Sequence, residues 1–188
     1  MDNNKTYIWY AGYGSNLNMQ RFLCYISGDQ PTYGQKPAKG CADKSLPLEN
    51  RPIRIPFSLY FALPDKRNET QNWGKGGVAF IRNTRSGDFT LGRMWKVTMA
   101  QYEEIRDQEG RGWYDVEIPL GEEEGVPVYT ITNGQILNNI LPPSRLYLKT
   151  IIQGLKETFN VTSEQIAAYL LTKDGIRNFY KQSELLEI

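Results

Sequence analysis

The chain has 188 residues and a mass of 21.6 kDa, which is enough for one domain with a substantial hydrophobic core. Its 22 basic and 21 acidic residues give a net charge of +1 and form no charged block, which argues against a nucleic-acid or anionic-membrane surface. The mean hydropathy is -0.53, and no apolar run reaches the length of about 20 residues that a membrane-spanning helix needs.

Histidine is absent from the chain. This removes the commonest catalytic base, the Ser-His-Asp and Cys-His arrangements and nearly every catalytic zinc site, so no metal is expected. Asp, Glu, Tyr or Lys must then transfer the protons of any catalysed reaction. The spacing of Cys24 and Cys41 matches no metal or redox motif, which predicts two reduced thiols. Residues 1–5 lack the apolar segment of a secretory signal, and we therefore expect a cytoplasmic protein.

The aromatic and apolar run at residues 7–13 predicts a buried strand. Gly14 then gives the backbone freedom for a turn, and Ser15 or Asn16 can cap a short helix that begins near Leu17. A strand that turns into a helix start leaves several backbone N–H groups pointing at one place, which favours an anion or a developing oxyanion. The simpler interpretation is a first strand and a tight turn without a ligand.

Residues 28–52 are rich in Gly, Pro and polar residues and predict a long surface loop or insertion. A strand follows at residues 53–63, where Pro56 indicates an edge or a bulge. Residues 76–83 predict a central strand, which a turn at residues 85–88 joins to a return strand at residues 89–97 as a hairpin.

The second informative element is a helix at residues 99–109. Thr98 and Gln101 form a capping box at its start, and Gly110 ends it. On a helical wheel Glu109 faces the core between Tyr102 and Ile105, whereas the other three acidic residues face solvent: Glu103, Glu104 and Asp107.

Burial and the negative end of the helix dipole are both expected to raise the pKa of Glu109. The alternative is an amphipathic edge residue that pairs with Arg106 or Arg111.

The remaining residues predict a second hairpin, from strands at 113–120 and 126–132, in which Tyr114 and Tyr129 can point to one side. Helices are expected at residues 145–159 after a Ser144 cap, at 166–172 after a capping box of Thr162 and Gln165, and near the end through residue 186. The whole is a single α+β domain over residues 1–188, with a mixed, possibly closed sheet and flanking helices.

The Tyr-Gly-Ser-Asn-Leu run at residues 13–17 resembles the signature of the gamma-glutamylcyclotransferase family, and the sequence at residues 107–110 resembles its Glu-Gly motif. Gly76 and Gly77, residues 92–97, residues 129–133 and residues 142–147 resemble later blocks in the same order, so the resemblance covers roughly residues 7–172. It implies a small mixed β-barrel-like sheet with flanking helices and catalysis by Glu109. It also implies substrate-binding residues: Tyr13, Gly14, Ser15, Asn16, Leu17, Tyr114, Tyr129 and Tyr147.

These parts suit the cyclisation of a small gamma-glutamyl substrate, a reaction that needs no cofactor. The substrate's α-amine attacks its γ-carbonyl, and 5-oxoproline and an amine are released. The turn would hold either the α-carboxylate or the γ-carbonyl oxygen. Residues 28–52 are longer than the family's usual connection, and the gap from Glu109 to Tyr114 is shorter than in the human-type enzyme. Several substrates therefore remain possible: a gamma-glutamyl dipeptide, a gamma-glutamyl amine, a lysine isopeptide and a gamma-glutamyl-protected antibiotic intermediate.

Two other functions compete with this one. The first is a non-catalytic module that binds a small carboxylate on the same fold. The second is a metal-dependent deacetylase or other amidohydrolase, which the lack of histidine disfavours.

Overall fold

The computed structural model describes residues 5–30, 37–64, 69–70, 72–85 and 87–188. The predictions for residues 1–4, for part of the 28–52 loop and for Ser86 in the 85–88 turn lie outside the described residues.

The largest sheet has five strands in the order β2 (Glu49–Ile55), β7 (Thr90–Thr98), β1 (Tyr7–Gly12), β9 (Val126–Thr132) and β8 (Val116–Glu123). β1 is central: it runs antiparallel to β7 and parallel to β9, so the sheet is mixed. Both faces of β1 are covered, because Trp9 and Ala11 join one core cluster and Ile8 and Tyr10 join the other. A strand that is buried on both faces has apolar residues at consecutive positions, which explains the composition of this segment.

Two small sheets complete the β structure. β3 (Leu59–Ala62) pairs with β6 (Val78–Ile81), and β4 (Glu69–Thr70) pairs with β5 (Gly74–Lys75). The hydroxyl of Thr132 in β9 accepts a hydrogen bond from the backbone N–H of Ile81 at 3.2 Å and donates one to the carbonyl of Ile81 at 2.8 Å, which ties β6 to the large sheet. The α+β class and the mixed sheet are thus confirmed, but the described strands form open sheets and no closed barrel.

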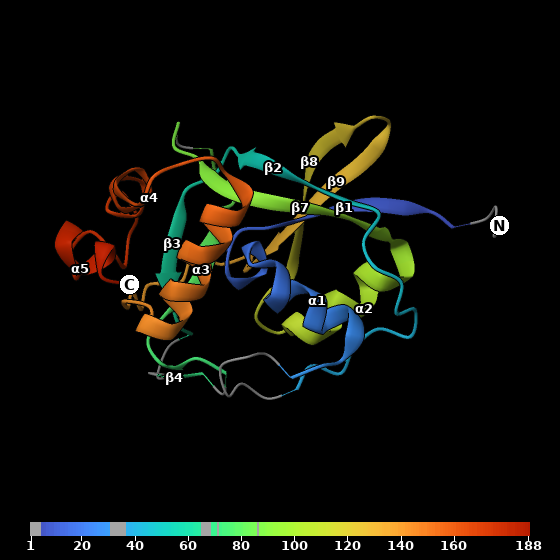
Figure 1. The fold of residues 1–188 in the computed structure, drawn as a ribbon, viewed down its shortest axis with the longest axis horizontal. Coiled ribbons are helices and arrows are strands. Elements are labelled where there is room, and N and C mark those ends of the chain that lie inside the picture. Colours follow the sequence, from blue (N-terminus) through green and yellow to red (C-terminus); the bar gives the residue numbers. More distant parts are fainter. Residues whose placement is uncertain (1–4, 31–36, 65–68, 71, 86) are drawn as a thin grey trace.

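The helices are η1 (Ser15–Leu17, a 3-10 turn), α1 (Met19–Ser27), α2 (Met99–Glu109), α3 (Arg145–Thr158), α4 (Ser163–Leu170) and α5 (Gln182–Leu186). α1 and α2 lie side by side, α3 packs on η1, and α4 and α5 follow at the opposite end of the molecule (Figure 1). None of the helices in the described part of the chain is both long and apolar enough to cross a membrane.

Several local predictions are confirmed. Capping boxes start α2 at Thr98 and α4 at Thr162, Ser144 caps α3, and β8 and β9 form the expected hairpin. The cap of α1 was predicted wrongly: the side chain of Asn18, not that of Ser15 or Asn16, accepts the hydrogen bond from the Arg21 backbone, because η1 occupies the residues between.

Two strand predictions are wrong. The expected strand at residues 53–63 is two strands in different sheets, because the chain breaks at Pro56, where Phe57 N–H bonds back to the Ile55 carbonyl at 2.8 Å. β6 and β7 are not a hairpin either, since β6 pairs with β3 while β7 pairs with β1 and β2. Turn residues between two strands indicate that the chain turns, but they do not fix which strands pair.

Candidate active site

The turn after β1 is tightly hydrogen-bonded within itself. The N–H of Leu17 donates to the Gly14 carbonyl and the N–H of Asn18 donates to the Ser15 carbonyl, both at 3.1 Å. The Leu17 side chain is packed in the core at 1% exposure. The Leu17 N–H is thus used inside the turn, and Leu17 lines neither of the cavities described below, so its contact with a substrate stays a prediction.

Close packing restricts position 14 to glycine. A Cβ at this position would lie 2.7 Å from the Tyr147 hydroxyl oxygen and 3.3 Å from the Ala79 Cβ. That hydroxyl accepts a hydrogen bond from the Ala79 N–H at 3.1 Å. Tyr147 thus supports the turn from behind and does not line the small cavity in front of it.

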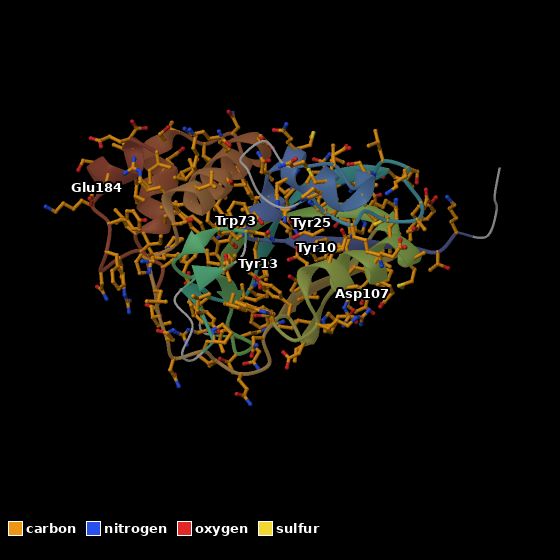
Figure 2. All side chains as sticks on the ribbon, turned by 90° about the horizontal axis from the view of Figure 1, so that it is seen from below. Tyr10, Tyr13, Tyr25, Trp73, Asp107 and Glu184 are labelled. Atoms are coloured by element: carbon orange, nitrogen blue, oxygen red, sulfur yellow. The ribbon has the colours of Figure 1, made fainter. Side chains whose placement is uncertain are left out.

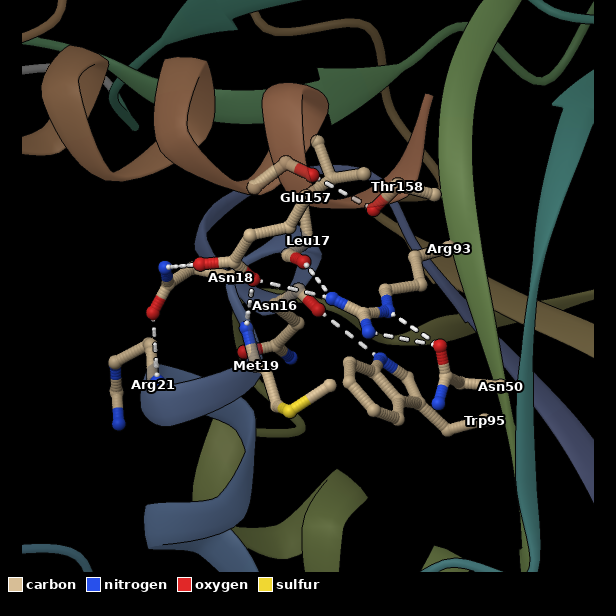
Figure 3. Close-up of polar contacts among 11 residues, drawn as sticks. Asn16, Leu17, Asn18, Met19, Arg21, Asn50, Arg93, Trp95, Glu157 and Thr158 are labelled. Carbon is tan, nitrogen blue, oxygen red and sulfur yellow. Dashed lines mark hydrogen bonds and ion pairs between the residues drawn. The ribbon is translucent and has the colours of Figure 1, made fainter. Parts of the chain in front are cut away.

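A buried arginine fixes the far side of the turn (Figure 3). Arg93, which is 3% exposed, donates to the Leu17 carbonyl at 3.2 Å and to the Glu157 carboxylate at 3.1 Å. The indole N–H of Trp95 donates to the Asn16 carbonyl at 3.0 Å. Glu157 also accepts two hydrogen bonds from the chain that follows the turn, at Asn18 Nδ2 (2.7 Å) and Met19 N (2.8 Å). β7 and α3 therefore hold the turn at one position.

The end of α2 brings Glu109 to this turn. The Glu109 carboxylate accepts a hydrogen bond from the side-chain amide of Asn16, which also donates to the Tyr10 hydroxyl at 3.2 Å. Glu109 forms no ion pair with Arg106 or Arg111. Those two arginines bind other carboxylates instead: Glu103 and Glu117 for Arg106, and Glu103 and Asp107 for Arg111. The edge-residue alternative is therefore wrong for Glu109.

Burial raises the pKa of Glu109. The Arg21 guanidinium, the Asn16 amide and the Tyr25 hydroxyl act in the opposite direction, and burial is the largest of the four effects. The direction agrees with the expectation from the helical wheel. A carboxyl group of raised pKa, held beside hydrogen-bond donors, is suited to general acid–base catalysis near neutral pH.

A small inner cavity of about 30 Å³ lies between the turn and the end of α2. Most of the predicted site residues line it: Tyr13, Gly14, Ser15, Asn16, Glu109 and Tyr114. Tyr10, Ala79 and Ile131 also line it, and the sequence had not indicated them. In a continuous strand, Tyr10 and Tyr13 would point to opposite faces of the sheet. Both rings line the same cavity because β1 ends at Gly12, before Tyr13.

The two predicted wall tyrosines have different places. The Tyr114 hydroxyl donates to the Ala79 carbonyl at 3.1 Å and lines the inner cavity. The Tyr129 ring stacks on Tyr102 with ring centroids 6.3 Å apart and lines neither the inner cavity nor the outer one described next. Tyr114 precedes β8, so the strand alternation that would place the two side chains on one side does not apply to it, and a contact between Tyr129 and a substrate stays a prediction.

A larger outer cavity of about 570 Å³ adjoins the inner one, and Glu109 and Tyr114 line both. Its other walls include Arg21, Tyr25, Trp73, Gln108 and Trp113. Figure 2 shows Tyr10, Tyr13, Tyr25 and Trp73 gathered in the middle of the molecule, whereas Asp107, on the same helix as Glu109, lies at the outside. Sequence reasoning missed Arg21, although it is the lone charged residue of the otherwise apolar and polar-neutral helix α1.

No family model matches the chain. Histone deacetylase 5 of Arabidopsis thaliana is 30% identical over 207 residues, covering 88% of this chain and 30% of that protein. The gamma-glutamylcyclotransferase of Bos taurus is 32% identical over 105 residues, covering 54% of each. The chain thus spans less than a third of the first relative's length and about half of the second's.

The solved structure of a gamma-glutamyl cyclotransferase aligns with 96% of this chain and 98% of its own, with a TM-score of 0.61 and 21% identity. The chain therefore has the fold of a gamma-glutamyl cyclotransferase.

Proposed function

We propose that this protein cyclises a gamma-glutamyl amide and releases 5-oxoproline and a free amine, with Glu109 as the acid and base. One observation carries the proposal: the Glu109 carboxylate is hydrogen-bonded to Asn16 of the turn and shares a small cavity with it. The fold of a gamma-glutamyl cyclotransferase supports the same assignment.

The reaction needs positioning and proton transfer. The α-amine of the substrate forms a bond to its own γ-carbonyl carbon, and the bond from that carbon to the leaving nitrogen breaks. The α-ammonium group loses two protons in all. Glu109 takes the first before the attack and the second as the ring nitrogen becomes an amide, and it passes both to the leaving nitrogen, which departs as an ammonium group. Holding the amine in line with the carbonyl can lower the barrier by as much as about 7 to 11 kcal/mol.

The size of the inner cavity limits what it can take. A volume of about 30 Å³ admits a group of roughly the size of one water molecule. We assign it to one small group of the glutamyl half, either the γ-carbonyl oxygen or the α-carboxylate. The Asn16 carboxamide oxygen, which is buried and has no partner among the described residues, can accept a hydrogen bond from the α-ammonium group. The remainder of the substrate then lies in the outer cavity.

The test is direct. The protein is incubated with gamma-glutamyl dipeptides, amines and isopeptides, and 5-oxoproline is followed by mass spectrometry. Release from at least one class supports the proposal. If no compound is turned over while 5-oxoproline still raises the melting temperature, the protein is the non-catalytic carboxylate-binding module and the enzymatic proposal is wrong.

We do not extend deacetylation to this chain, since the match to the plant protein covers less than a third of that protein.

A further inference from the structure

Arg21 is a buried cation with unused hydrogen-bonding capacity. It lies on α1 and is 7% exposed. Its Nη2 donates to the Tyr25 hydroxyl at 2.9 Å, and its guanidinium lies 4.4 Å from the centroid of the Tyr25 ring and 5.9 Å from that of Trp73. Its Nε and Nη1 are buried and have no hydrogen-bond partner among the described residues.

A buried charge that lacks an ionic partner is costly, and proteins rarely retain one without use. Arg21 forms no direct ion pair with a carboxylate in the described part of the chain, although its charge lowers the pKa of Glu109. The guanidinium presents a planar fork of donors that matches a carboxylate in a bidentate arrangement. The aromatic rings of Tyr25 and Trp73 flank the guanidinium, and its Nε and Nη1 keep donors that no described residue uses; either of them, together with Nη2, forms one edge of the fork.

The position of Arg21 indicates which end of a substrate it meets. Arg21 lines the outer cavity and is not part of the inner one, and Glu109 lies where the two cavities join. The bond to be broken must lie at Glu109. Because the inner cavity accepts only one small group of the glutamyl half, the leaving half must extend outward, past Arg21 and Trp73.

The cavity system also continues beyond Arg21. A further hollow of about 400 Å³ shares Arg21, Tyr25, Asn72 and Gln108 with the outer cavity and reaches residues 37–40. There is thus room on the leaving side for more than a simple alkylamine.

We propose that Arg21 is a specificity-determining residue that binds a carboxylate on the leaving half of the substrate. The preferred substrates are then gamma-glutamyl conjugates of amines that carry a carboxylate, such as an amino acid or a peptide end, in preference to neutral amines. This inference rests on the proposed function, because it assumes that the leaving half occupies the outer cavity.

The experiment compares two ligands that differ only in charge, gamma-glutamylalanine and gamma-glutamylalaninamide. Their affinities are measured by calorimetry for Glu109→Gln, so that no turnover interferes, and again with Arg21→Met or Arg21→Lys added. Arg111→Met is the matched control, since it removes the same charge from an exposed residue on the neighbouring segment. Release of 5-oxoproline by the unmodified protein is measured separately.

We expect the acid to bind about 10- to 100-fold more tightly than the amide, and Arg21→Met to abolish this difference while Arg111→Met retains it. Arg21→Lys should keep part of the preference.

Equal binding of the two ligands, or a preference that survives Arg21→Met, overturns the proposal. An equal loss for both ligands in Arg21→Met also overturns it, because Arg21 would then bind the glutamyl half that they share. If the unmodified protein releases no 5-oxoproline but the binding preference for the acid still depends on Arg21, the proposed catalysis is wrong and the carboxylate site at Arg21 is supported.

Discussion

The side-chain amide of Asn16 donates a hydrogen bond to the carboxylate of Glu109, although the two residues are 93 positions apart in the chain. Asn16 belongs to the turn after the central strand, and Glu109 is the last residue of α2. This contact joins the two segments that carry the chemistry and fixes the carboxylate at the point where the inner and outer cavities meet.

The raised pKa of Glu109 predicts a pH-dependent gain in stability for Glu109→Gln. Below the unfolded-state pKa of about 4.3, the Glu109 carboxyl is protonated in both the folded and the unfolded protein, so its ionisation does not lower the free energy of unfolding there. As the pH rises through the higher folded-state pKa, the native protein resists ionisation and the wild type loses stability relative to the glutamine variant. We expect the melting temperature of the variant, relative to wild type, to rise between pH 4 and pH 8 by scanning calorimetry. Glu122→Gln, an exposed change, should show no such trend, and a flat difference for Glu109→Gln would contradict the assignment.

Arg21 should also set the pH range of the reaction. Its positive charge lowers the pKa of Glu109 against the larger effect of burial. Arg21→Met therefore should move the acidic limb of the pH–rate profile to higher pH, because the carboxyl loses a favourable charge, whereas Arg21→Lys should move it less. Profiles of kcat against pH for the three proteins test this, and an unchanged limb in Arg21→Met would show that Arg21 does not act on Glu109.

Gly14 and Tyr147 are expected to be energetically coupled. A Cβ at position 14 would lie 2.7 Å from the Tyr147 hydroxyl oxygen, so Gly14→Ala should cost about 1 to 3 kcal/mol of stability through overpacking. Tyr147→Phe removes that oxygen and leaves the Ala79 N–H without its acceptor. In the Tyr147→Phe background, Gly14→Ala should cost less. A double-mutant cycle of unfolding free energies measures the coupling, and strictly additive values would be inconsistent with this contact.

Arg93 is predicted to hold the turn in place. Arg93→Met removes the donors to the Leu17 carbonyl and to Glu157, which should lower the free energy of unfolding by about 1 to 3 kcal/mol. It should also reduce the release of 5-oxoproline, because Asn16 and Glu109 would no longer be held at one separation. Arg177→Met is the control: Arg177 is exposed and pairs only with Asp174 among the described residues, so the change should stay within about 0.5 kcal/mol. Equal effects of the two changes on unfolding and activity would contradict the role of Arg93.

The sequence predicted the parts of the site that depend on local pattern. The position of Glu109 followed from a helix whose start and end had clear signals, Thr98 and Gly110. The turn at residues 13–17 was recognisable from its motif. Tyr10 and Arg21 were not predicted: strand alternation places Tyr10 opposite Tyr13, and Arg21 could only have been found as a charge in a helix that packs against the core.

Strand partners were harder to predict than strands. The pairing of β7 with β1 and β2, rather than with β6, depends on contacts between residues far apart in the chain. Sequence periodicity reports which face of a strand is buried, but it does not identify the neighbouring strand. The stacking of Tyr129 on Tyr102 likewise joins residues far apart in the chain, because Tyr102 comes from α2.

The most direct test of the account is 5-oxoproline release from gamma-glutamylalanine by the wild type, Glu109→Gln and Glu103→Gln, followed by mass spectrometry. Glu103→Gln changes a carboxylate on the same helix that binds arginines and lines neither cavity, so it should leave the rate unchanged. Glu109→Gln should keep the fold and lower the rate at least about 100-fold, as expected for loss of a general acid–base. A folded Glu109→Gln protein that releases 5-oxoproline as fast as the wild type would contradict the central claim.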